Sequence, residues 1–276
     1  MPDINNQSVP QHGTAKKRSA IFTPRAPIKH STYLILGITG FLLVLLIWCA
    51  LTYGGLVDPF FLPTPSETIQ AAVDLFSKLG FIRDVGMTVV RVMIGFLLAA
   101  VIAVPLGILL GTYKPIEGFL EPLLSFARYL PASAFIPLFI LWIGVSETEK
   151  IAIIFLGSFP QLILMVAAAA MNVKNDLIDV SYTLGTSKTA VLRHVILPAS
   201  MPSIMGSLRM ILGWAWTYII VAELVGASSG IGYMIIQSQR MLNTAQIFVG
   251  ILTIGVIGLI FDYLFKWLAK LLFPWN

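Results

Sequence analysis

Apolar runs long enough to cross a bilayer recur along the chain and constrain its fold more than any other feature. A helix needs about 20 apolar residues to span ~30 Å of hydrocarbon. Such runs occupy residues 33–52, 85–111, 118–143, 150–171, 199–226 and 245–268. Only 11% of the residues are charged, whereas soluble domains carry about 25%, so a soluble protein of this composition could not cover its own surface. The sequence therefore predicts an all-α integral membrane protein with six transmembrane helices.

Lysine and arginine are distributed unevenly between the segments that join these spans. Residues 1–32 are polar and proline-rich, so we interpret them as a disordered cytoplasmic tail. Residues 33–270 are expected to form one transmembrane domain, whose longest inner loop covers residues 172–198. With six spans, eleven Lys and Arg residues fall in the inner segments and four in the outer ones. Because positively charged segments stay in the cytoplasm, both termini are expected there.

Small residues and prolines inside the expected spans indicate where helices pack or break. Small residues recur at every fourth position from Gly95 to Gly111, which gives the second span a face for close helix packing. Pro131 and Pro137 predict a break in the third span. Irregular backbone at membrane depth usually lines a cavity, so this break is a place to look for a pathway.

Two short helices are expected outside the spans, on the outer surface. Ser66 is expected to cap an amphipathic helix that continues to Leu79. The second short helix is expected over residues 230–241, between the fifth and sixth spans. Neither segment is long or apolar enough to cross the membrane.

The loop between the fourth and fifth spans is more structured than a simple connector. A helix is expected over residues 176–184, and Gly185 suits the left-handed position that ends it. Thr186 or Ser187 can cap a second short helix, and Pro198 then resets the chain for the fifth span. A helix, a glycine turn and a helix held between two spans predict a rigid, protruding knob that a soluble partner could push.

This loop resembles the signature of the inner-membrane permease subunits of binding-protein-dependent ABC importers. That signature reads Glu-Ala-Ala, three residues, Gly, nine residues, Ile, one residue, Leu-Pro. Aligned on Gly185, the chain has at the other signature positions Asp179, Val180, Ser181, Val195, Leu197 and Pro198. The glycine and the Leu-Pro pair match at the same separation, whereas the acid is shorter and both alanines are replaced. The loop also falls between spans four and five of six, as it does in that family.

Further segments resemble one branch of the family, the permeases for nitrate, sulfonates, taurine and bicarbonate. The matching segments are Phe61 to Pro65, Arg128 with Pro131, Ala134, Pro137 and Leu138, Trp142 to Gly144 with Glu147, Thr148 and Lys150, Ala222 to Leu224, and Gly230 to Met234. Near Arg128 the chain departs from the branch, because Tyr129 and Ala132 replace prolines often found there and Ser133 adds a hydroxyl.

The resemblance implies a type I ABC importer (MetI-like) permease fold with a cytoplasmic coupling helix. It implies a bacterial inner-membrane location and four kinds of partner: a second permease subunit, expected to be an identical chain, two ABC ATPase subunits, a periplasmic or lipid-anchored solute-binding protein, and the lipid bilayer. No nucleic acid is expected to bind. The residues expected to couple the chain to the ATPase are Asp179, Ser181, Leu184, Gly185, Thr186, Ser187, Val195, Leu197 and Pro198.

The chain is not expected to hydrolyse ATP itself. Residues 185–189 superficially resemble a phosphate-binding loop, but that motif needs a glycine immediately before Lys188 and a strand before the loop, and the sequence has neither. We therefore expect this chain to bind no cofactor of its own, and ATP and Mg²⁺ to lie on the partner ATPase.

Charged residues inside the expected spans are the first candidates for a translocation path. On insertion scales a charged residue costs ~2.5–3.5 kcal/mol at a helix centre, so each one needs a partner, a wet cavity or a route to the surface. Arg209, Trp216 and Glu223 are spaced by seven residues and share one face of the fifth span. Three arginines against one glutamate favour a small anion as solute. The path candidates are Arg91, Arg128, Tyr129, Ser133, Arg209, Trp216 and Glu223.

The same charges also have a purely structural interpretation. Arg91 could extend to the membrane surface, Arg209 could tie the fifth span to a neighbour, and Glu223 could cap Ser228 or Ser229 near the outer end. Both interpretations remain open from the sequence.

The sequence hypothesis is a pore-forming subunit of an ATP-driven importer for a small anion such as a sulfonate, taurine, nitrate or bicarbonate. The alternative is a stand-alone secondary transporter or channel for a small anion, which would show uptake without ATP and often carries internal inverted repeats. A third possibility is a structural membrane scaffold, which solute-stimulated ATP hydrolysis in a complex would exclude.

Overall fold

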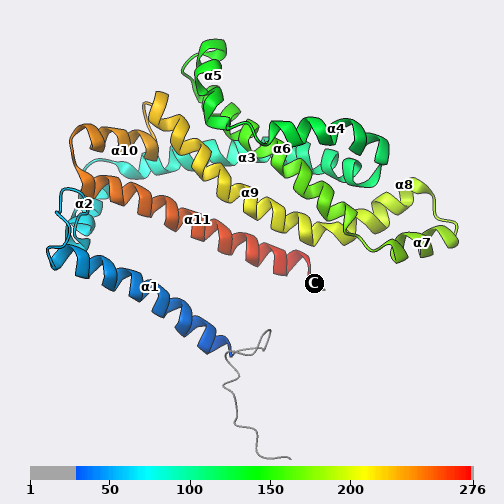
Figure 1. Ribbon diagram of the computed structural model, residues 1–276, viewed down its shortest axis with the longest axis horizontal. Coiled ribbons are helices and arrows are strands. Elements are labelled where there is room, and N and C mark those ends of the chain that lie inside the picture. The colour runs from blue at the N-terminus through cyan, green and yellow to red at the C-terminus, as the bar shows by residue number, and fades with distance from the viewer. Residues whose placement is uncertain (1–28, 275–276) are drawn as a thin grey trace, which may run out of the picture. The chain divides into compact units, whose positions relative to one another are not determined.

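Every regular element in the described part of the chain is a helix (Figure 1). The computed structural model describes residues 29–274. Contacts within the chain divide it into two units, Met1–Val57 and Asp58–Asn276. Five described helices are long and apolar enough to cross a membrane, and there are up to six spans if one bent helix pair counts as a crossing. The predicted all-α membrane architecture is confirmed.

The first unit contributes one helix, α1 (His30–Tyr53). Its 23 residues from Ser31 onward are long and apolar enough to cross a membrane and include no charged side chain. The helix begins three residues before the predicted start of the first span. The remainder of the predicted N-terminal tail lies outside the described residues.

The second unit is built around four long helices that lie side by side (Figure 1). They are α3 (Phe81–Thr112), α6 (Glu147–Met171), α9 (Leu197–Gly226) and α11 (Thr244–Leu272). The most extensive contact joins α3 to α6, and α6 in turn packs on α9. The core between them consists of buried aliphatic and aromatic side chains.

Close contact between α3 and α6 depends on the small residues of α3, as the sequence predicted. A Cβ atom at Gly95 would lie 2.7 Å from Ile154 Cβ, and one at Gly107 would lie 2.7 Å from Val166 Cβ. Such distances are shorter than real Cβ contacts, so glycine lets the two helix backbones approach. Ala99 and Ala103, between these glycines, are completely buried.

The predicted third span is broken. It consists of α4 (Lys114–Ala127), a short 3₁₀ helix η2 (Ala132–Phe135) and α5 (Ile136–Ile143), and the two parts meet at 79°. Pro131 has an extended conformation at the break because its ring prevents continuation of the preceding helix. The break predicted from the prolines is therefore confirmed.

Two short helices, α2 (Pro65–Ser77) and α10 (Ile231–Arg240), lie where short helices were expected. The expected cap of α2 was wrong, because Thr64 rather than Ser66 caps it. Thr64 Oγ1 accepts the Glu67 N–H at 3.2 Å, and Glu67 Oε2 accepts the Thr64 N–H at 2.8 Å. This reciprocal pair is a capping box.

The loop after α6 contains α7 (Asn175–Thr183), α8 (Lys188–Val191) and a π-helical turn η3 (Leu192–Ile196). The expected interruption at Pro198 was wrong, since residues Lys188–Gly226 form one continuous 39-residue helical segment. A proline ring normally clashes with the carbonyl four residues earlier. The wider π turn lies directly before Pro198, and such a turn lets the helix continue past the proline.

Candidate functional site

Residues 175–191, which comprise α7, the turn around Gly185 and α8 and which we call the knob, expose apolar side chains. Leu184 is 79% exposed and Val180 is 57% exposed, although both are hydrophobic. Gly185 has φ +78°, the left-handed conformation predicted for it and the one that favours glycine. Ser187 caps α8 by accepting the Ala190 N–H at 3.4 Å.

The base of the knob is attached to the long helices by a small apolar cluster. Its members are Ala170 at the end of α6, Val173 in the connection, Val191 in α8 and Ile196 in η3, all buried. Because α8 and η3 continue directly into α9, the knob is joined to α6 by a short connection and to α9 by continuous helix. The base of the knob is therefore anchored to both helices.

The fold brings together the two halves of the sequence signature, which are separated by the glycine turn. A groove of about 530 Å³ is lined by Asp176, Leu177, Val180, Ser181, His194, Val195, Pro198 and Ala199. Ser181 comes from the first half of the signature, and Val195 and Pro198 come from the second. Asp179 and Ser187 lie on the exposed surface beside it, whereas Thr186 and Leu197 are half-buried.

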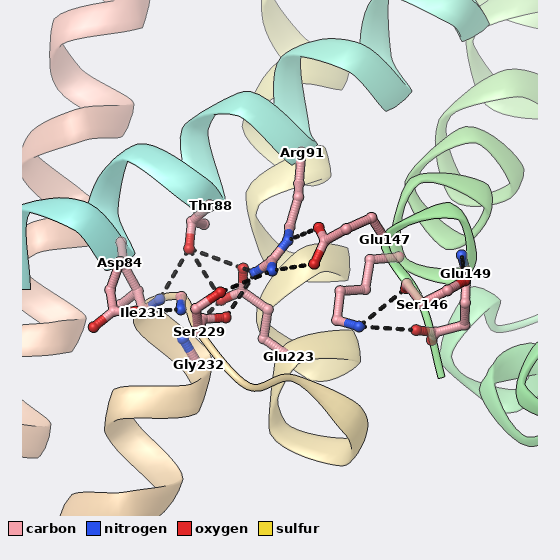
Figure 2. Close-up of polar contacts among 12 residues, drawn as sticks. Asp84, Thr88, Arg91, Ser146, Glu147, Glu149, Glu223, Ser229, Ile231 and Gly232 are labelled. Atoms are coloured by element: carbon pink, nitrogen blue, oxygen red, sulfur yellow. Dashed lines mark hydrogen bonds and ion pairs between the residues drawn. The ribbon is translucent and has the colours of Figure 1, made fainter. Parts of the chain in front are cut away.

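A buried charged network is centred on Arg91 (Figure 2). It contacts the start of α10, and α10 lies at the end of the bundle opposite the knob (Figure 1). The Arg91 side chain is 1% exposed, so it does not extend to the membrane surface. It binds Glu147 through two nitrogens, Nε at 2.5 Å and Nη2 at 2.6 Å, and it binds Glu223 Oε1 through Nη1 at 2.8 Å. Nη1 and Nη2 also donate to Ser229, at 2.7 Å to the carbonyl and 3.1 Å to the hydroxyl. Each nitrogen of the guanidinium therefore has a partner within the protein.

The same network holds the start of α10. Gly232 N–H donates to Glu223 Oε2 at 2.8 Å, and Ile231 N–H donates to Thr88 Oγ1 at 2.9 Å. Gly230 N–H donates to Asp84 Oδ1 at 2.7 Å. Thr88 Oγ1 in turn donates to the Glu223 carboxylate at 2.9–3.0 Å. The free N–H groups at the helix start are thus satisfied by two acids and a hydroxyl, which also suit the positive end of the helix dipole.

Two glycines permit this arrangement. Gly230 has φ +118°, and a Cβ there would lie 2.5 Å from Glu223 Cδ. A Cβ at Gly232 would lie 2.6 Å from Glu223 Cβ. The loop can therefore approach the Glu223 side chain closely only because these positions lack side chains.

A second buried pair lies at the start of α6, beside the Arg91 network (Figure 2). Glu149 and Lys150 are 0% and 2% exposed, and Lys150 Nζ contacts Glu149 Oε2 at 3.4 Å and donates to the Ser146 carbonyl at 3.1 Å. Glu149 Oε1 has no hydrogen-bond partner among the described residues. Glu147 and Glu149 thus both lie in the first turn of α6, where the helix dipole favours negative charge.

The remaining path candidates lie apart from this network. Arg128, Tyr129 and Ser133 are exposed at the break between α4 and η2, where Arg128 Nη2 lies 3.1 Å from Tyr129 Oη and its guanidinium lies 4.9 Å from the Tyr129 ring centroid. Arg209 Nε lies 3.3 Å from Asp262 Oδ1 on α11. Trp216 is 3% exposed and packs on Phe261, with ring centroids 5.6 Å apart. Arg209, Trp216 and Glu223 are thus spaced by seven residues on α9, but their side chains lie in three different surroundings.

Sequence reasoning missed several members of these clusters. Asp84, Thr88 and Arg91 are four and three residues apart, a spacing that could have placed them on one helix face. Asp262 lies inside the expected sixth span, four residues before Lys266, and could have been found by the same rule. Glu147 was noted only for its resemblance to the family, and its pairing with Arg91 had no local signal because the two residues are 56 positions apart in the sequence.

Comparison with known proteins shows which family the chain belongs to. Residues 103–275 match the model of the family described as "Binding-protein-dependent transport system inner membrane component". The chain is 29% identical to the taurine transport system permease protein TauC of Escherichia coli K12, over 91% of this chain and 93% of TauC. It is 28% identical to the nitrate import permease protein NrtB of a Synechocystis strain, over 77% of this chain and 81% of NrtB.

A solved structure shares the fold. The chain superposes on a subunit of the MetNI methionine ABC transporter in an inward-facing conformation with a TM-score of 0.63 and 18% sequence identity. The match covers 69% of this chain and 94% of that subunit. The MetI-like fold predicted from the sequence is confirmed. This chain belongs to the family of binding-protein-dependent transport system inner membrane components, the multi-pass permease subunits of ABC importers.

Proposed function

We propose that this chain forms the transmembrane pore of an ATP-driven importer for a small anion, and that the knob docks on a separate ATPase subunit. The observation that carries the coupling proposal is the exposure of the apolar side chains on a rigid, helix-supported knob. An exposed apolar surface of this kind is typical of a protein interface. The nature of the solute is supported by the taurine and nitrate permeases among the relatives, since taurine and nitrate are both small and carry an anionic group.

Continuous helix gives the proposed coupling a physical path. From α8 to the end of α9 the chain contains no non-helical residue, so displacement of the knob moves α9 as a rod. Glu223 lies near the far end of that rod and binds α10 directly and α3 through Arg91 and Thr88. We infer that Arg91 and Glu223 transmit this movement to the opposite end by holding α3, α9 and α10 together, rather than by touching solute.

For the translocation path we propose the break between α4 and η2. Arg128, Tyr129 and Ser133 are exposed there, on the irregular backbone that membrane proteins tolerate where it lines a cavity. The Arg128 guanidinium supplies the positive charge that an anion requires. Trp216 is buried, and we assign it a packing role against α11.

The proposed orientation places the knob and both termini in the cytoplasm of a bacterium, where the ATPase and its ATP and Mg²⁺ are found. The opposite end, with α2 and α10, then faces the solute-binding protein. A second permease subunit, an identical chain in the simplest assembly, would complete the pore, and two ATPase subunits would bind the two knobs.

Transport by the reconstituted complex tests the proposal. Proteoliposomes containing the permease, its ATPase and its binding protein are expected to take up taurine or nitrate only with ATP, and solute is expected to stimulate ATP hydrolysis. Deletion of residues 182–190 is expected to abolish both activities while the permease still inserts.

The alternative of a stand-alone secondary transporter or channel predicts a different result. Uptake by the permease alone, without ATP or ATPase, would contradict the proposed function and support that alternative. Uptake that persists after deletion of residues 182–190 would contradict the role of the knob.

Arg128→Gln is expected to reduce uptake, whereas Arg83→Gln, which replaces an exposed arginine on α3, is expected to leave uptake unchanged.

A further inference from the structure

A cleft between α9 and α11 is lined by basic and aromatic side chains. Its volume is about 510 Å³, and its charged and aromatic lining residues are Arg209, Tyr263, Phe265, Lys266, Trp267 and Lys270. Gly206, on α9, keeps the floor of the cleft free of a side chain, since nothing lies within 4 Å of the position its Cβ would take. The cleft thus combines space with three cations.

The charges in the cleft are not balanced within the described residues. Asp262 lies at 3.3 Å from Arg209 Nε and at 2.6 Å from Lys266 Nζ. No described residue forms an ion pair with Lys270, and no carboxylate is found among the described residues that line the cleft. Among the described residues, one acid therefore stands against three cations, and the Arg209 side chain is 38% exposed and so accessible to a further anion.

The cleft is lined by residues from the first half of α9 and the last third of α11, and both of these parts lie toward the end of the bundle that bears the knob (Figure 1). Arg209 is twelve residues after the start of α9, about 18 Å along the helix at 1.5 Å per residue, and Lys270 is in the last turn of α11. Tyr263 and Trp267 are 66% and 59% exposed on α11. Exposed Tyr and Trp near helix ends are typical of the level at which lipid headgroups lie.

We propose that this cleft binds the phosphate of an anionic phospholipid. The guanidinium and the two ammonium groups would hold the phosphate, while the acyl chains lie along exposed apolar side chains of α11 such as Ile260 and Leu264. Basic pockets between transmembrane helices are suited to such headgroups. A free phosphate would satisfy the cations but not the adjoining apolar face, which is why we assign the site to lipid. With the orientation proposed above, the lipid belongs to the cytoplasmic leaflet.

Binding to lipids of different charge tests the site. The delipidated permease in neutral detergent micelles is titrated with phosphatidylglycerol or phosphatidylcholine, and bound lipid is counted by native mass spectrometry. We expect phosphatidylglycerol to bind at least tenfold more tightly than phosphatidylcholine. Lys270→Gln, which removes no ion pair among the described residues, is expected to weaken phosphatidylglycerol binding about fivefold, the contribution of one cation near a membrane surface.

A matched pair of double variants separates the cleft from the general surface charge. Lys266→Gln with Lys270→Gln is expected to abolish the preference for phosphatidylglycerol. Lys78→Gln with Lys114→Gln removes the same charge from lysines whose side chains are 73% and 84% exposed, and it is expected to retain the preference. Equal loss in both double variants, or equal binding of the two lipids by the unaltered protein, would overturn the proposal.

Competition by soluble anions distinguishes a lipid site from a site for a free anion. Inorganic phosphate, taurine and nitrate are added as competitors at millimolar concentration, and none is expected to displace phosphatidylglycerol. Displacement by phosphate would show a site for a free anion, and displacement by taurine or nitrate would return Arg209 to the transport path. Either result would overturn the lipid assignment without affecting the proposed function of the knob.

Discussion

The two ends of the Asp58–Asn276 unit differ in what they bury and what they expose. One end buries paired charges, and the other exposes apolar side chains. At one end Arg91 and Glu223 are each 1% exposed, and Arg91 binds both Glu223 and Glu147 inside the protein. At the other end Leu184 is 79% exposed, and nothing in the described chain covers it. The first end thus holds its buried arginine with acids of the same chain, whereas the second presents apolar surface that the proposed contact with the ATPase would bury.

This difference predicts different consequences of mutation. A buried ion pair adds little net stability compared with a well-packed apolar pair, but loss of one partner leaves an uncompensated buried charge and is costly. An exposed apolar residue adds nothing to the stability of the isolated chain, but it contributes when a partner covers it. Damage at the Arg91 end should therefore reduce stability, and damage at the knob should reduce coupling.

The largest effect is expected from Arg91→Met. The substitution leaves the Glu223 and Glu147 carboxylates without their cation, so the free energy of unfolding should fall by ~3–5 kcal/mol. Thermal and denaturant unfolding of the purified permease in micelles measures this change. Arg83→Gln, an exposed residue on the same helix, serves as the control and should change stability by less than about 0.5 kcal/mol. Equal stability of the two variants would show that the network is dispensable.

A smaller loss of stability is expected from Thr88→Val, which keeps the side-chain volume but removes the hydroxyl. The Ile231 N–H loses its acceptor, and Glu223 loses a donor. A buried group left without its hydrogen bond costs ~1–3 kcal/mol. Thr88→Ser should recover most of the loss. Thr112→Val, which removes a hydroxyl bonded to the Ile108 carbonyl of the same helix, is the matched control, and a comparable loss there would argue against a special role for Thr88.

Substitution of Gly185 should affect both properties, with coupling the more affected. A side chain in the left-handed conformation costs ~1–2 kcal/mol, so Gly185→Val should destabilise the turn modestly or change its path. The reconstituted complex should then lose solute-stimulated ATP hydrolysis while the permease remains inserted. Gly185→Asn should retain coupling, because asparagine tolerates the left-handed region. Full coupling by the valine variant would mean that the turn geometry is unimportant.

The smallest effect on stability is expected from Leu184→Ser. An exposed side chain contributes little to folding, so unfolding should change by less than about 0.5 kcal/mol. Binding to the ATPase subunit should nevertheless weaken about tenfold, because burial of a leucine at an interface contributes ~1.5–3 kcal/mol. Leu242→Ser, 67% exposed beyond α10 at the other end, should leave that affinity unchanged. An unaltered affinity in the Leu184 variant would remove it from the docking surface.

Features that depend on a few neighbouring residues could be predicted from the sequence. The apolar runs, the break near Pro131 and the left-handed Gly185 each follow from local chemistry. Two local predictions, the cap of α2 and the interruption at Pro198, were nevertheless wrong because another local interaction was stronger. The reciprocal bond with Glu67 made Thr64 the cap of α2, and the π turn before Pro198 kept α9 continuous with α8.

The sequence by itself determined the membrane class, the helices and the glycine turn, because hydrophobic length and backbone preference act within one segment. Only the tertiary structure decided what the buried charges do. Arg91 meets Glu147 and Glu223, which are 56 and 132 residues away, and Arg209 meets Asp262 on another helix. Whether a charge in lipid is a solute contact or a structural pair depends on what lies within about 3 Å of it. That distance is set by helix packing, which local sequence patterns do not encode.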